Sequence, residues 1–211
     1  MFRAPSIGGL ILAAGDSSRM GTDKALLPWP PSGSVHVPSR ETFLSAAIRS
    51  LSHIADFVLV VAGKNEAALR SIVYSAGESV VVNRDPSRGQ FSSLQVGVQE
   101  VLNRGRDAAL ITLVDRPPAT AGTLDALHDA FEFAPNEIWA VIPEYEGKHG
   151  HPFLAGRELM AAFLQAPVTS NAREVEHRFQ QHIQYVPVND PQIVMNINTP
   201  EEYAQLASQP R

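Results

Sequence analysis

The sequence predicts an α/β fold: a doubly wound, mostly parallel β-sheet covered by helices on both faces, in three layers. Short apolar runs typical of buried strands alternate with segments of helical periodicity through the first two-thirds of the chain. The first run, Ile7 to Ala14, is almost wholly apolar, as expected of a strand covered on both faces. It opens directly into a loop of small, polar and basic residues. In such sheets ligands bind beyond the carboxyl ends of the strands, so this loop is a candidate functional site.

The remaining elements are expected in the same alternation. Further strands are expected at Phe57 to Ala62, Ser79 to Val82, Asp107 to Val114, Ile138 to Ile142 and Ile183 to Val188. Helices are expected at Glu41 to His53, after Asn65, at Phe91 to Leu102, at Thr120 to Phe133, at Glu158 to Leu164, at Ala172 to Gln180 and from Thr199 onward.

Five local features add detail to these elements. The prolines of Leu26 to Ser39 exclude a regular helix or a central strand and indicate a surface excursion. Asn65 is expected to cap the helix that follows it. Gly97 lies inside a predicted helix, where glycine costs on the order of 1 kcal/mol relative to alanine, so a close-packing reason is expected. Thr199-Pro-Glu-Glu202 combines a capping threonine, a first-turn proline and a glutamate at the third helical position. Lys148 to Leu154 is predicted as a short loop or strand.

Composition limits the class of protein. The 211 residues carry a formal net charge of -5, which argues against a nucleic-acid or anionic-membrane partner. Cysteine is absent, so disulfides, thiolate metal sites and a cysteine nucleophile are excluded. We find no signal-peptide pattern and no apolar run of the roughly 20 residues that a membrane span needs. The sequence therefore predicts one cytoplasmic domain over residues 1–211.

The opening loop resembles a phosphate-binding cradle. Gly15 and Gly21 permit close approach of backbone N–H groups to an anion, while Arg19 and Lys24 add positive charge. The spacing is not that of a Walker loop, because five residues separate the glycines and Lys24 comes three residues after the second. The G-x-G-x-x-G dinucleotide fingerprint is also absent after the first strand.

Several motifs, in this order, resemble the MobA-like NTP transferase family, the relatives of the molybdenum-cofactor cytidylyl- and guanylyltransferases. The most specific is L-A-A-G-x-S-x-R-M-G-x-x-K from Leu12 to Lys24. The others are Gly89-x-x-Ser-Ser-Leu-x-x-Gly97, Leu113-Val-Asp-Arg-Pro117, Gly147-x-x-Gly-His-Pro152 and Asn196-Ile-Asn-Thr-Pro-Glu-Glu202. The resemblance covers most of the chain and implies a Rossmann-like nucleotidyltransferase fold. It implies transfer of a nucleoside monophosphate from an NTP to an acceptor phosphate, with Mg²⁺ as cofactor and release of pyrophosphate.

Different motifs of this chain resemble different branches of the family, which use different nucleotide bases. Ala14 and the Gly-His-Pro segment are similar to the cytidylyl branch, whereas Asn196-Ile-Asn198 is similar to the guanylyl branch. We expect CTP rather than GTP, with a molybdopterin-type phosphate as acceptor and a molybdoenzyme or its chaperone as a possible protein partner. A sugar phosphate is an alternative acceptor, and a non-catalytic nucleotide or cofactor binder is the alternative to an enzyme.

Catalytic and metal-binding roles follow from the resemblance together with residue chemistry. Asp115 ends an apolar strand and is expected to hold Mg²⁺, with Asn196 or Asn198 as a second oxygen ligand. Lys24 and Arg19 are expected to bind the phosphates and neutralise their charge. The alternative for Asp115 is a turn cap before a proline, and that for the two cations is a solvated loop charge.

Further residues are expected to position the two substrates. Backbone groups of Leu12, Ala13, Ala14 and Gly15 are expected to face the nucleotide, although close strand-to-helix packing explains such residues equally well. Asn83, Ser92 and Ser93 either face the nucleotide or act as a turn former and helix caps. Gly150 and His151 are expected to contact the acceptor, or to form a simple turn. His149 and His151 have a zinc-like spacing but no third ligand nearby.

Overall fold

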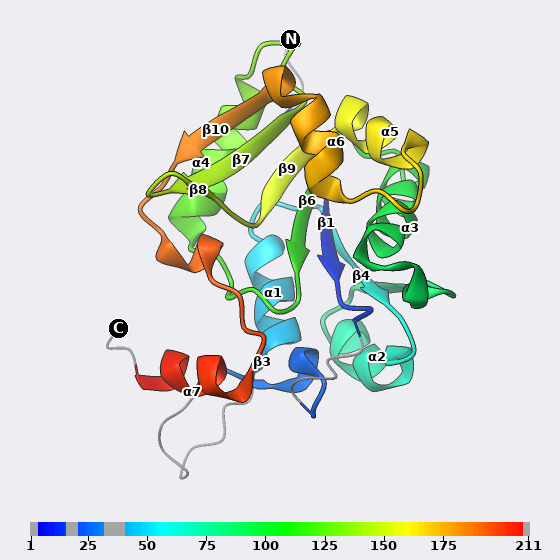
Figure 1. Cartoon of the computed structure of the whole chain (residues 1–211), viewed down its shortest axis with the longest axis vertical. Helices are drawn as coiled ribbons and strands as arrows, with labels where there is room; N and C mark the ends of the chain where they lie inside the picture. Colours follow the sequence, from blue (N-terminus) through cyan, green and yellow to red (C-terminus); the bar gives the residue numbers. More distant parts are fainter. Residues whose placement is uncertain (1–3, 16–20, 32–40, 209–211) are drawn as a thin grey trace.

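The computed structural model describes residues 4–15, 21–31 and 41–208 of the chain (Figure 1). An eight-stranded sheet forms its centre, with the order β10-β7-β9-β6-β1-β4-β5 and with β8 paired to β7. Its strands are β1 (Ile7–Leu12), β4 (Phe57–Ala62), β5 (Ser79–Val82), β6 (Ala108–Leu113), β7 (Ala140–Tyr145), β8 (Lys148–His149), β9 (Phe153–Gly156) and β10 (Ile183–Pro187). Two short strands, β2 (Pro28–Trp29) and β3 (Glu41–Thr42), pair separately.

Helices connect these strands. The α-helices are α1 (Phe43–Leu51), α2 (Glu66–Ser75), α3 (Gln90–Asn103), α4 (Ala121–Glu132), α5 (Arg157–Gln165), α6 (Ala172–Arg178) and α7 (Pro200–Ser208). Short 3-10 turns are η1 (Lys24–Leu26), η2 (Pro86–Arg88), η3 (Gln180–His182) and η4 (Pro191–Val194). None of the helices in the described part of the chain is long and apolar enough to cross a membrane.

The sheet is mostly parallel, as the sequence predicts. Strands β5, β4, β1 and β6 run parallel in that order, and β10 runs parallel to β7. Strand β9 lies between β6 and β7 and is antiparallel to both. The sequence indicated only a short loop or strand at Lys148 to Leu154, so the sheet position of β9 was not predicted. It moves the β7–β10 pair one strand further from β1.

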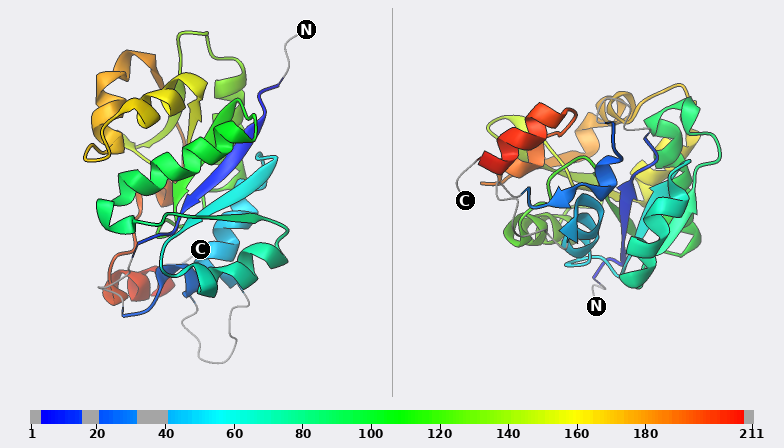
Figure 2. Two further views of the ribbon diagram at one scale, coloured as in Figure 1. Left: turned by 90° about the vertical axis from the view of Figure 1, so that its right-hand side faces the viewer. Right: turned by 90° about the horizontal axis from the view of Figure 1, so that it is seen from below.

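The helices form the two outer layers (Figure 2). One apolar cluster joins the sheet to α1, α2 and α4, and it includes Leu44, Leu69 and Leu124. A second cluster joins the opposite face to α3, α5 and α6, and it includes Leu94 and Phe163. Both clusters share the central strands, whose side chains alternate between the faces. The predicted three-layer α/β fold is confirmed.

Gly97 has the close-packing role that its place in a helix suggested. It faces β1 and β4, because a Cβ added at this position would collide with the Leu10 side chain and lie 2.8 Å from Val61 Cγ2. Helix α3 is thereby able to approach the two central strands closely. This approach brings the first turn of α3 to the end of the sheet where β1 ends.

Two helix starts show how local sequence and tertiary contacts compete. The predicted start at Thr199 is confirmed: Glu202 N–H donates to Thr199 Oγ1 at 3.2 Å, and a Glu202 carboxylate oxygen accepts from Thr199 N–H at 3.2 Å. Asn65 is the N-cap residue of α2, as predicted, but the capping hydrogen bond expected of its side chain is absent. The side chain turns toward the opening loop instead, where it finds other partners.

The segment that follows the opening loop and the last helix meet below the sheet. In Figure 1, β2, η1 and α7 all lie under the arrowheads of β1 and β6. Tyr203 on α7 donates its hydroxyl proton to the Pro28 carbonyl oxygen at 2.8 Å, and its ring lies 6.1 Å from that of Phe43. The segment before α7 is therefore held close to the opening loop.

Candidate active site

Three side chains that are far apart in the sequence meet beyond the carboxyl ends of β1 and β6. The Lys24 Nζ group donates to Asp115 Oδ2 at 3.0 Å and to Asn198 Oδ1 at 3.0 Å. The Lys24 and Asp115 side chains are only 12% and 21% exposed. Lys24 begins η1, Asp115 comes two residues after β6, and Asn198 lies two residues before α7. The structure thus brings one residue from each of three predicted motifs into direct contact.

The position of Lys24 is set by a small hydrogen-bond network. Asp23 caps η1 with one carboxylate oxygen and accepts from Asn65 Nδ2 at 2.6 Å with the other. Asn65 Nδ2 also donates to the Ala13 carbonyl oxygen at 2.9 Å, while Asn65 Oδ1 accepts from Gly63 N–H at 3.0 Å. One amide therefore joins the two sides of the opening loop to the β4–α2 turn. Sequence reasoning missed this role because Asn65 also has the residue type of a helix cap.

The segment that carries Asn198 is fixed to the end of β6. Ile197 is buried, and its N–H donates to the Asp115 carbonyl oxygen at 3.0 Å. The Arg116 Nη1 group donates to the Met195 carbonyl oxygen at 3.0 Å. Two neighbouring residues after β6 thus hold the same segment, one through its main chain and one through its guanidinium group. Arg116 lies within the Leu113 to Pro117 motif, but residue type alone gave it no role.

The oxygen atoms of this site fit a hard divalent cation. Asp115 Oδ1 is buried and has no hydrogen-bond partner within the described part of the chain. An unpaired buried carboxylate oxygen is costly, and carboxylate and amide oxygens are the ligands that Mg²⁺ and similar cations prefer. Asn198 supplies an amide oxygen next to Asp115, whereas Asn196 is exposed. Asn198 is accordingly the better placed of the two predicted ligands.

The opening loop is only partly described. The Ala13 N–H donates to the Val61 carbonyl oxygen at 2.9 Å, and the Leu12 carbonyl oxygen accepts from Val114 N–H at 3.1 Å. Ala14 is buried and Gly15 is exposed. The main chain of Leu12 and Ala13 is therefore engaged by the sheet and by Asn65. The predicted phosphate ligand Arg19 lies outside the described residues.

Asn83, Ser92 and Ser93, which were expected to face the nucleotide or to act as a turn former and helix caps, form a buried network. Asn83 Nδ2 donates to Ser92 Oγ at 2.8 Å and to Ser93 Oγ at 3.0 Å, and Asn83 Oδ1 accepts from Asp85 N–H at 3.0 Å. All three residues are buried. The amide of Asn83 is fully used, so this residue holds the first turn of α3 against the end of β5. That matches the structural alternative considered for it.

Gly150 and His151 also have structural partners. The Gly150 Cα lies so close to η4 that an added Cβ would be 2.5 Å from the Ile193 carbonyl oxygen. The same oxygen accepts from His151 N–H at 2.9 Å, and Gly150 N–H donates to the Pro143 carbonyl oxygen at 2.9 Å. This turn therefore fixes η4, which leads into the segment containing Asn198.

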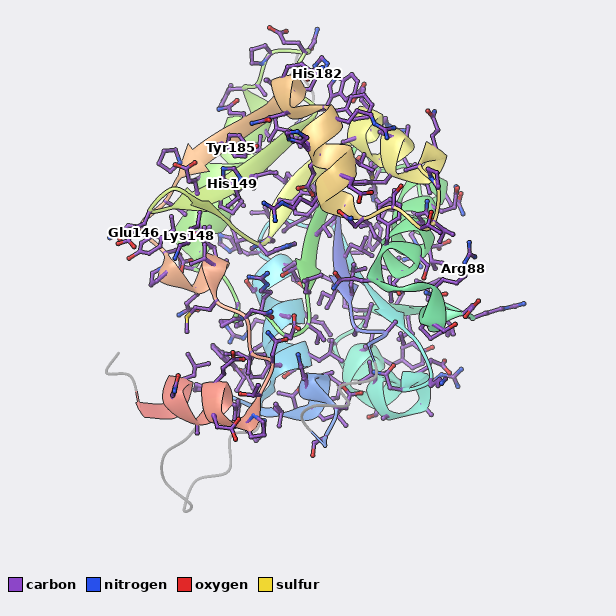
Figure 3. All side chains as sticks on the ribbon, viewed as in Figure 1. Arg88, Glu146, Lys148, His149, His182 and Tyr185 are labelled. Atoms are coloured by element: carbon purple, nitrogen blue, oxygen red, sulfur yellow. The ribbon has the colours of Figure 1, made fainter. Side chains whose placement is uncertain are left out.

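The two histidines of the zinc-like spacing face different partners. The His149 ring stacks on Tyr185 at a centroid distance of 3.9 Å, and Figure 3 shows these two residues side by side on β8 and β10. His149 Nε2 also lies 3.4 Å from Glu144 Oε2. The His151 ring lies instead near the Ile111 carbonyl oxygen, 3.4 Å from its Nδ1 atom. The two imidazoles thus have separate environments.

Burial lowers the pKa values of both His151 and Arg116. Burial lowers the pKa of His151 to about 4, with a further contribution from the positive charge of Arg116; the Ile111 carbonyl and Asp115 oppose the shift. Burial also lowers the pKa of Arg116, and the neighbouring Asp115 carboxylate partly offsets this. At neutral pH His151 is therefore uncharged, while Arg116 keeps its charge because an arginine is effectively always protonated in proteins.

Curated relatives named as molybdenum cofactor nucleotidyltransferases resemble this chain. A probable molybdenum cofactor guanylyltransferase of Rhodopirellula baltica is 31% identical over 134 residues, which are 64% of this chain and 60% of that protein. The molybdenum cofactor guanylyltransferase of Shewanella frigidimarina is 28% identical over 98% of both chains. The molybdenum cofactor cytidylyltransferase of Escherichia coli is 24% identical over 94% of both chains. Relatives of both base specificities thus match the chain.

Solved structures show the same fold. Rv0371c from Mycobacterium tuberculosis superimposes with a TM-score of 0.79 at 24% identity and covers 97% of this chain and 100% of its own. A manganese complex of the same protein has a TM-score of 0.75 at 22% identity, with the same coverage. A nucleotidyl transferase from Methanothermobacter has a TM-score of 0.75 at 22% identity over 96% of both chains. These solved structures therefore share the mostly parallel α/β fold of this chain.

The family follows from the match over the site-forming segments. Residues 9–184 match the model of the MobA-like NTP transferase domain. This range includes most of β1, Lys24, the turn of Asn83 and Asp115, whereas Asn198 lies beyond its end. The chain belongs to the MobA-like NTP transferase family.

Proposed function

We propose that this protein is an Mg²⁺-dependent nucleotidyltransferase that transfers CMP from CTP to the phosphate of a molybdopterin-type cofactor. The observation that carries this proposal is the contact of Lys24 with Asp115 and Asn198 at the carboxyl end of the sheet. A cation, a carboxylate and an amide oxygen at this place suit a triphosphate and its metal ion. Relatives named as molybdenum cofactor nucleotidyltransferases support the acceptor class.

The choice of CTP rests on Ala14, on the Gly-His-Pro segment and on the Ser-Ser-Leu segment, which are similar to the cytidylyl branch. The curated relatives do not separate the bases, because guanylyl and cytidylyl enzymes both match nearly the full chain. GTP is the alternative, favoured by the Asn196-Ile-Asn198 segment. A sugar phosphate is the alternative acceptor, and its test is the acceptor arm of the experiment below.

The reaction that we propose needs positioning and charge neutralisation rather than a protein base. An oxygen of the acceptor phosphate, already ionised at neutral pH, forms a bond to the α-phosphorus of the NTP. The bond from that phosphorus to the bridging oxygen breaks, and pyrophosphate leaves with the electron pair. Lys24 binds the phosphate oxygens, and the first turn of α3, held by Asn83, presents backbone N–H groups toward the same end of the sheet.

Asp115 and Asn198 are the residues that would hold the divalent cation. When bound, such an ion neutralises charge on the phosphates and aligns them for displacement. The manganese complex of Rv0371c supports a divalent metal in a protein of this fold. Because Lys24 occupies an oxygen of each ligand, we infer that its ammonium group transfers from Asp115 to the phosphates when the NTP and its metal ion bind.

The proposal is tested by pyrophosphate release. Purified protein is incubated with Mg²⁺, molybdopterin and each of the four NTPs in turn, and then with CTP and a panel of sugar phosphates. We expect release with CTP and molybdopterin, and slower release with GTP.

Asp115→Asn, which keeps the size of the side chain but removes its charge, is expected to lower turnover more than nucleotide affinity. Nucleotide binding without pyrophosphate release from any acceptor would instead indicate a nucleotide or cofactor binder. The proposed cytoplasmic location and a molybdoenzyme or chaperone partner fit this activity.

A further inference from the structure

We propose that Arg116 binds the phosphate of the acceptor, at the point where the end of β6, the turn of Gly150 and His151, and the segment before α7 meet. This inference rests on the proposed function and deepens it, because it identifies a cation for the second substrate. The ligand class is a phosphomonoester dianion. Lys24 serves the NTP, and a separate positive charge is needed for the attacking phosphate, since two anions must approach each other.

Arg116 is a half-buried cation that lacks a carboxylate partner. No acidic group of the described residues lies within ion-pair distance of its guanidinium group, although Asp115 is its neighbour in the chain. Its Nη1 atom is used by the Met195 carbonyl oxygen, and its Nε atom is buried without a hydrogen-bond partner. A buried donor of this kind carries a desolvation cost, and an anion beside the guanidinium group would offset part of that cost through its charge.

Arg106 shows that the unpaired Nε atom alone is not sufficient. Arg106 Nε is also buried without a hydrogen-bond partner, but it lies 3.7 Å from Asp56 Oδ2, and its guanidinium group lies over the Phe57 ring. The charge of Arg106 is therefore compensated near the amino end of the sheet. Within the described part of the chain Arg116 makes no ion pair of this kind, and it lies at the carboxyl end, next to Asp115.

The neighbours of Arg116 come from the segments that the sequence assigned to the acceptor and the metal. His151 lies close enough to Arg116 for the charge of the guanidinium group to lower the pKa of the imidazole. The Met195 carbonyl oxygen accepts a hydrogen bond from Arg116. Asp115, the proposed metal ligand, is the preceding residue. An acceptor phosphate on Arg116 would thus lie next to the proposed metal site, which an in-line attack on the α-phosphorus requires.

The competing explanation is purely structural: Arg116 holds only the Met195 carbonyl oxygen. Arg116→Gln separates the two explanations, because glutamine keeps an N–H donor for that oxygen but removes the charge. Arg157→Gln is the matched control. Arg157 also donates to a backbone carbonyl oxygen, that of Gly105 at 3.2 Å, but it pairs with Asp107 just before the opposite end of β6.

Binding is measured by calorimetric titration of inorganic phosphate, in protein saturated with Mg²⁺ and an α,β-methylene analogue of CTP that fills the nucleotide site. We expect Arg116→Gln to weaken phosphate binding about 10- to 100-fold, the usual effect of losing charge-assisted hydrogen bonds. Arg157→Gln should bind phosphate as the wild type does. Equal phosphate affinity in Arg116→Gln and the wild type, or no binding by the wild type, would overturn the inference.

Two further measurements complete the test. In turnover assays with molybdopterin, Arg116→Gln should raise the KM for the acceptor about tenfold or more. The KM for the NTP should stay within about twofold of the wild-type value. A purely structural role of Arg116 would change both KM values. A second measurement uses the wild-type fold and covers the case in which Arg116→Gln does not fold. The ¹⁵N–¹H resonance of Arg116 Nε, assigned by its absence in Arg116→Lys, should shift as phosphate is added, and an unshifted resonance would contradict the proposal.

The failure of this inference is distinguishable from failure of the proposed function. Pyrophosphate release with an unchanged acceptor KM in Arg116→Gln would refute the phosphate site and leave the activity standing. Phosphate binding that depends on Arg116, without pyrophosphate release from any NTP and acceptor, would support the phosphate site and refute the activity.

Discussion

At the scale of single residues, the site couples two roles that the sequence treated separately. Lys24 was predicted to bind phosphate, and Asp115 was predicted to bind a metal ion with Asn196 or Asn198 as a second ligand. The structure places the ammonium group on an oxygen of Asp115 and an oxygen of Asn198. A metal ion and Lys24 therefore compete for the same oxygens until a nucleotide offers Lys24 another anion.

This competition gives Lys24→Ala two opposite effects. We expect the variant to bind Mn²⁺ alone more tightly than the wild type, on the order of fivefold, because removal of a partly buried ion pair frees about 1 kcal/mol of carboxylate interaction. The same variant should lose about 1.5–3 kcal/mol of transition-state stabilisation with the NTP, measured as kcat/KM.

Calorimetric titration with Mn²⁺ and no nucleotide checks the first effect. Lys148→Ala is the control, because Lys148 is an exposed residue of β8 in the hairpin beside Tyr185 (Figure 3). Weaker Mn²⁺ binding by Lys24→Ala would mean that Lys24 supports the metal ligands rather than competing for them.

His151 provides a prediction on stability. Its pKa is about 4 in the folded protein and near 6.5 in an unfolded chain, so between these values the unfolded chain binds more protons. Stability must therefore fall as the pH falls from 7 toward 4. For a shift of this size the loss between pH 7 and pH 5 is about 2 kcal/mol.

Urea unfolding at pH 7 and pH 5 measures this loss, with His151→Gln as the reference because glutamine does not titrate. The wild type should lose about 2 kcal/mol more than the variant over this interval. The expected excess comes from the buried neutral imidazole beside Arg116, Asp115 and the Ile111 carbonyl group. An equal loss in both proteins would show that His151 is protonated freely in the folded state.

At the scale of elements, the contact of α3 with β1 and β4 decides where the first turn of α3 lies. Gly97 makes this contact possible, since any Cβ there meets Leu10 and Val61. Ser92 and Ser93, held by Asn83, belong to the same helix. Packing in the helix interior and the position of the turn that faces the site are therefore linked.

Two glycine-to-alanine substitutions test this link. Gly97→Ala should destabilise the protein by about 1–3 kcal/mol, because the added methyl group forces α3 away from the sheet. Gly122→Ala is the matched control within α4, where an added Cβ would meet nothing within 4 Å, and it should stabilise by about 0.5–1 kcal/mol. Chemical denaturation measures both. A neutral Gly97→Ala would mean that α3 does not need this close approach.

At the scale of the whole molecule, both apolar clusters use the same sheet. The cluster on α1, α2 and α4 and the cluster on α3, α5 and α6 face opposite sides of β1, β4 and β6. Neither layer of helices has a sheet of its own. We therefore expect residues 1–211 to behave as one cooperative domain.

The two tryptophans allow a direct test of cooperativity. Trp29 lies in β2 against Phe43, whereas Trp139 lies just before β7, stacked on His182 near the upper end of the sheet (Figure 3). Fluorescence of Trp29→Phe and Trp139→Phe then follows each region alone. The two variants should have unfolding transitions of the same shape. In each variant the fluorescence transition should coincide with the circular dichroism transition. Separate fluorescence and circular dichroism transitions within one variant would indicate two domains.

Much of the fold could be predicted because it follows from local pattern. Apolar runs and helical periodicity place most strands and helices, and the Thr199 capping box is confirmed in detail. The antiparallel strand β9 could not be predicted in the same way, since a four-residue strand carries little periodic signal and its partners lie elsewhere in the chain. The Asn65 side chain does not make the capping hydrogen bond expected of it, because a local cap and a distant hydrogen bond use the same residue type.

The sequence by itself determined the family, the layers of the fold and the residue types of the site, because motifs and burial patterns are local properties. Tertiary structure alone decided which of those residues meet. It selected Asn198 as the neighbour of Lys24 and Asp115, engaged Asn83 in a buried network, and left Arg116 Nε at the end of β6 without a hydrogen-bond partner among the described residues. The physical reason is that hydrogen bonds and charge compensation depend on distances between segments, which no local pattern encodes.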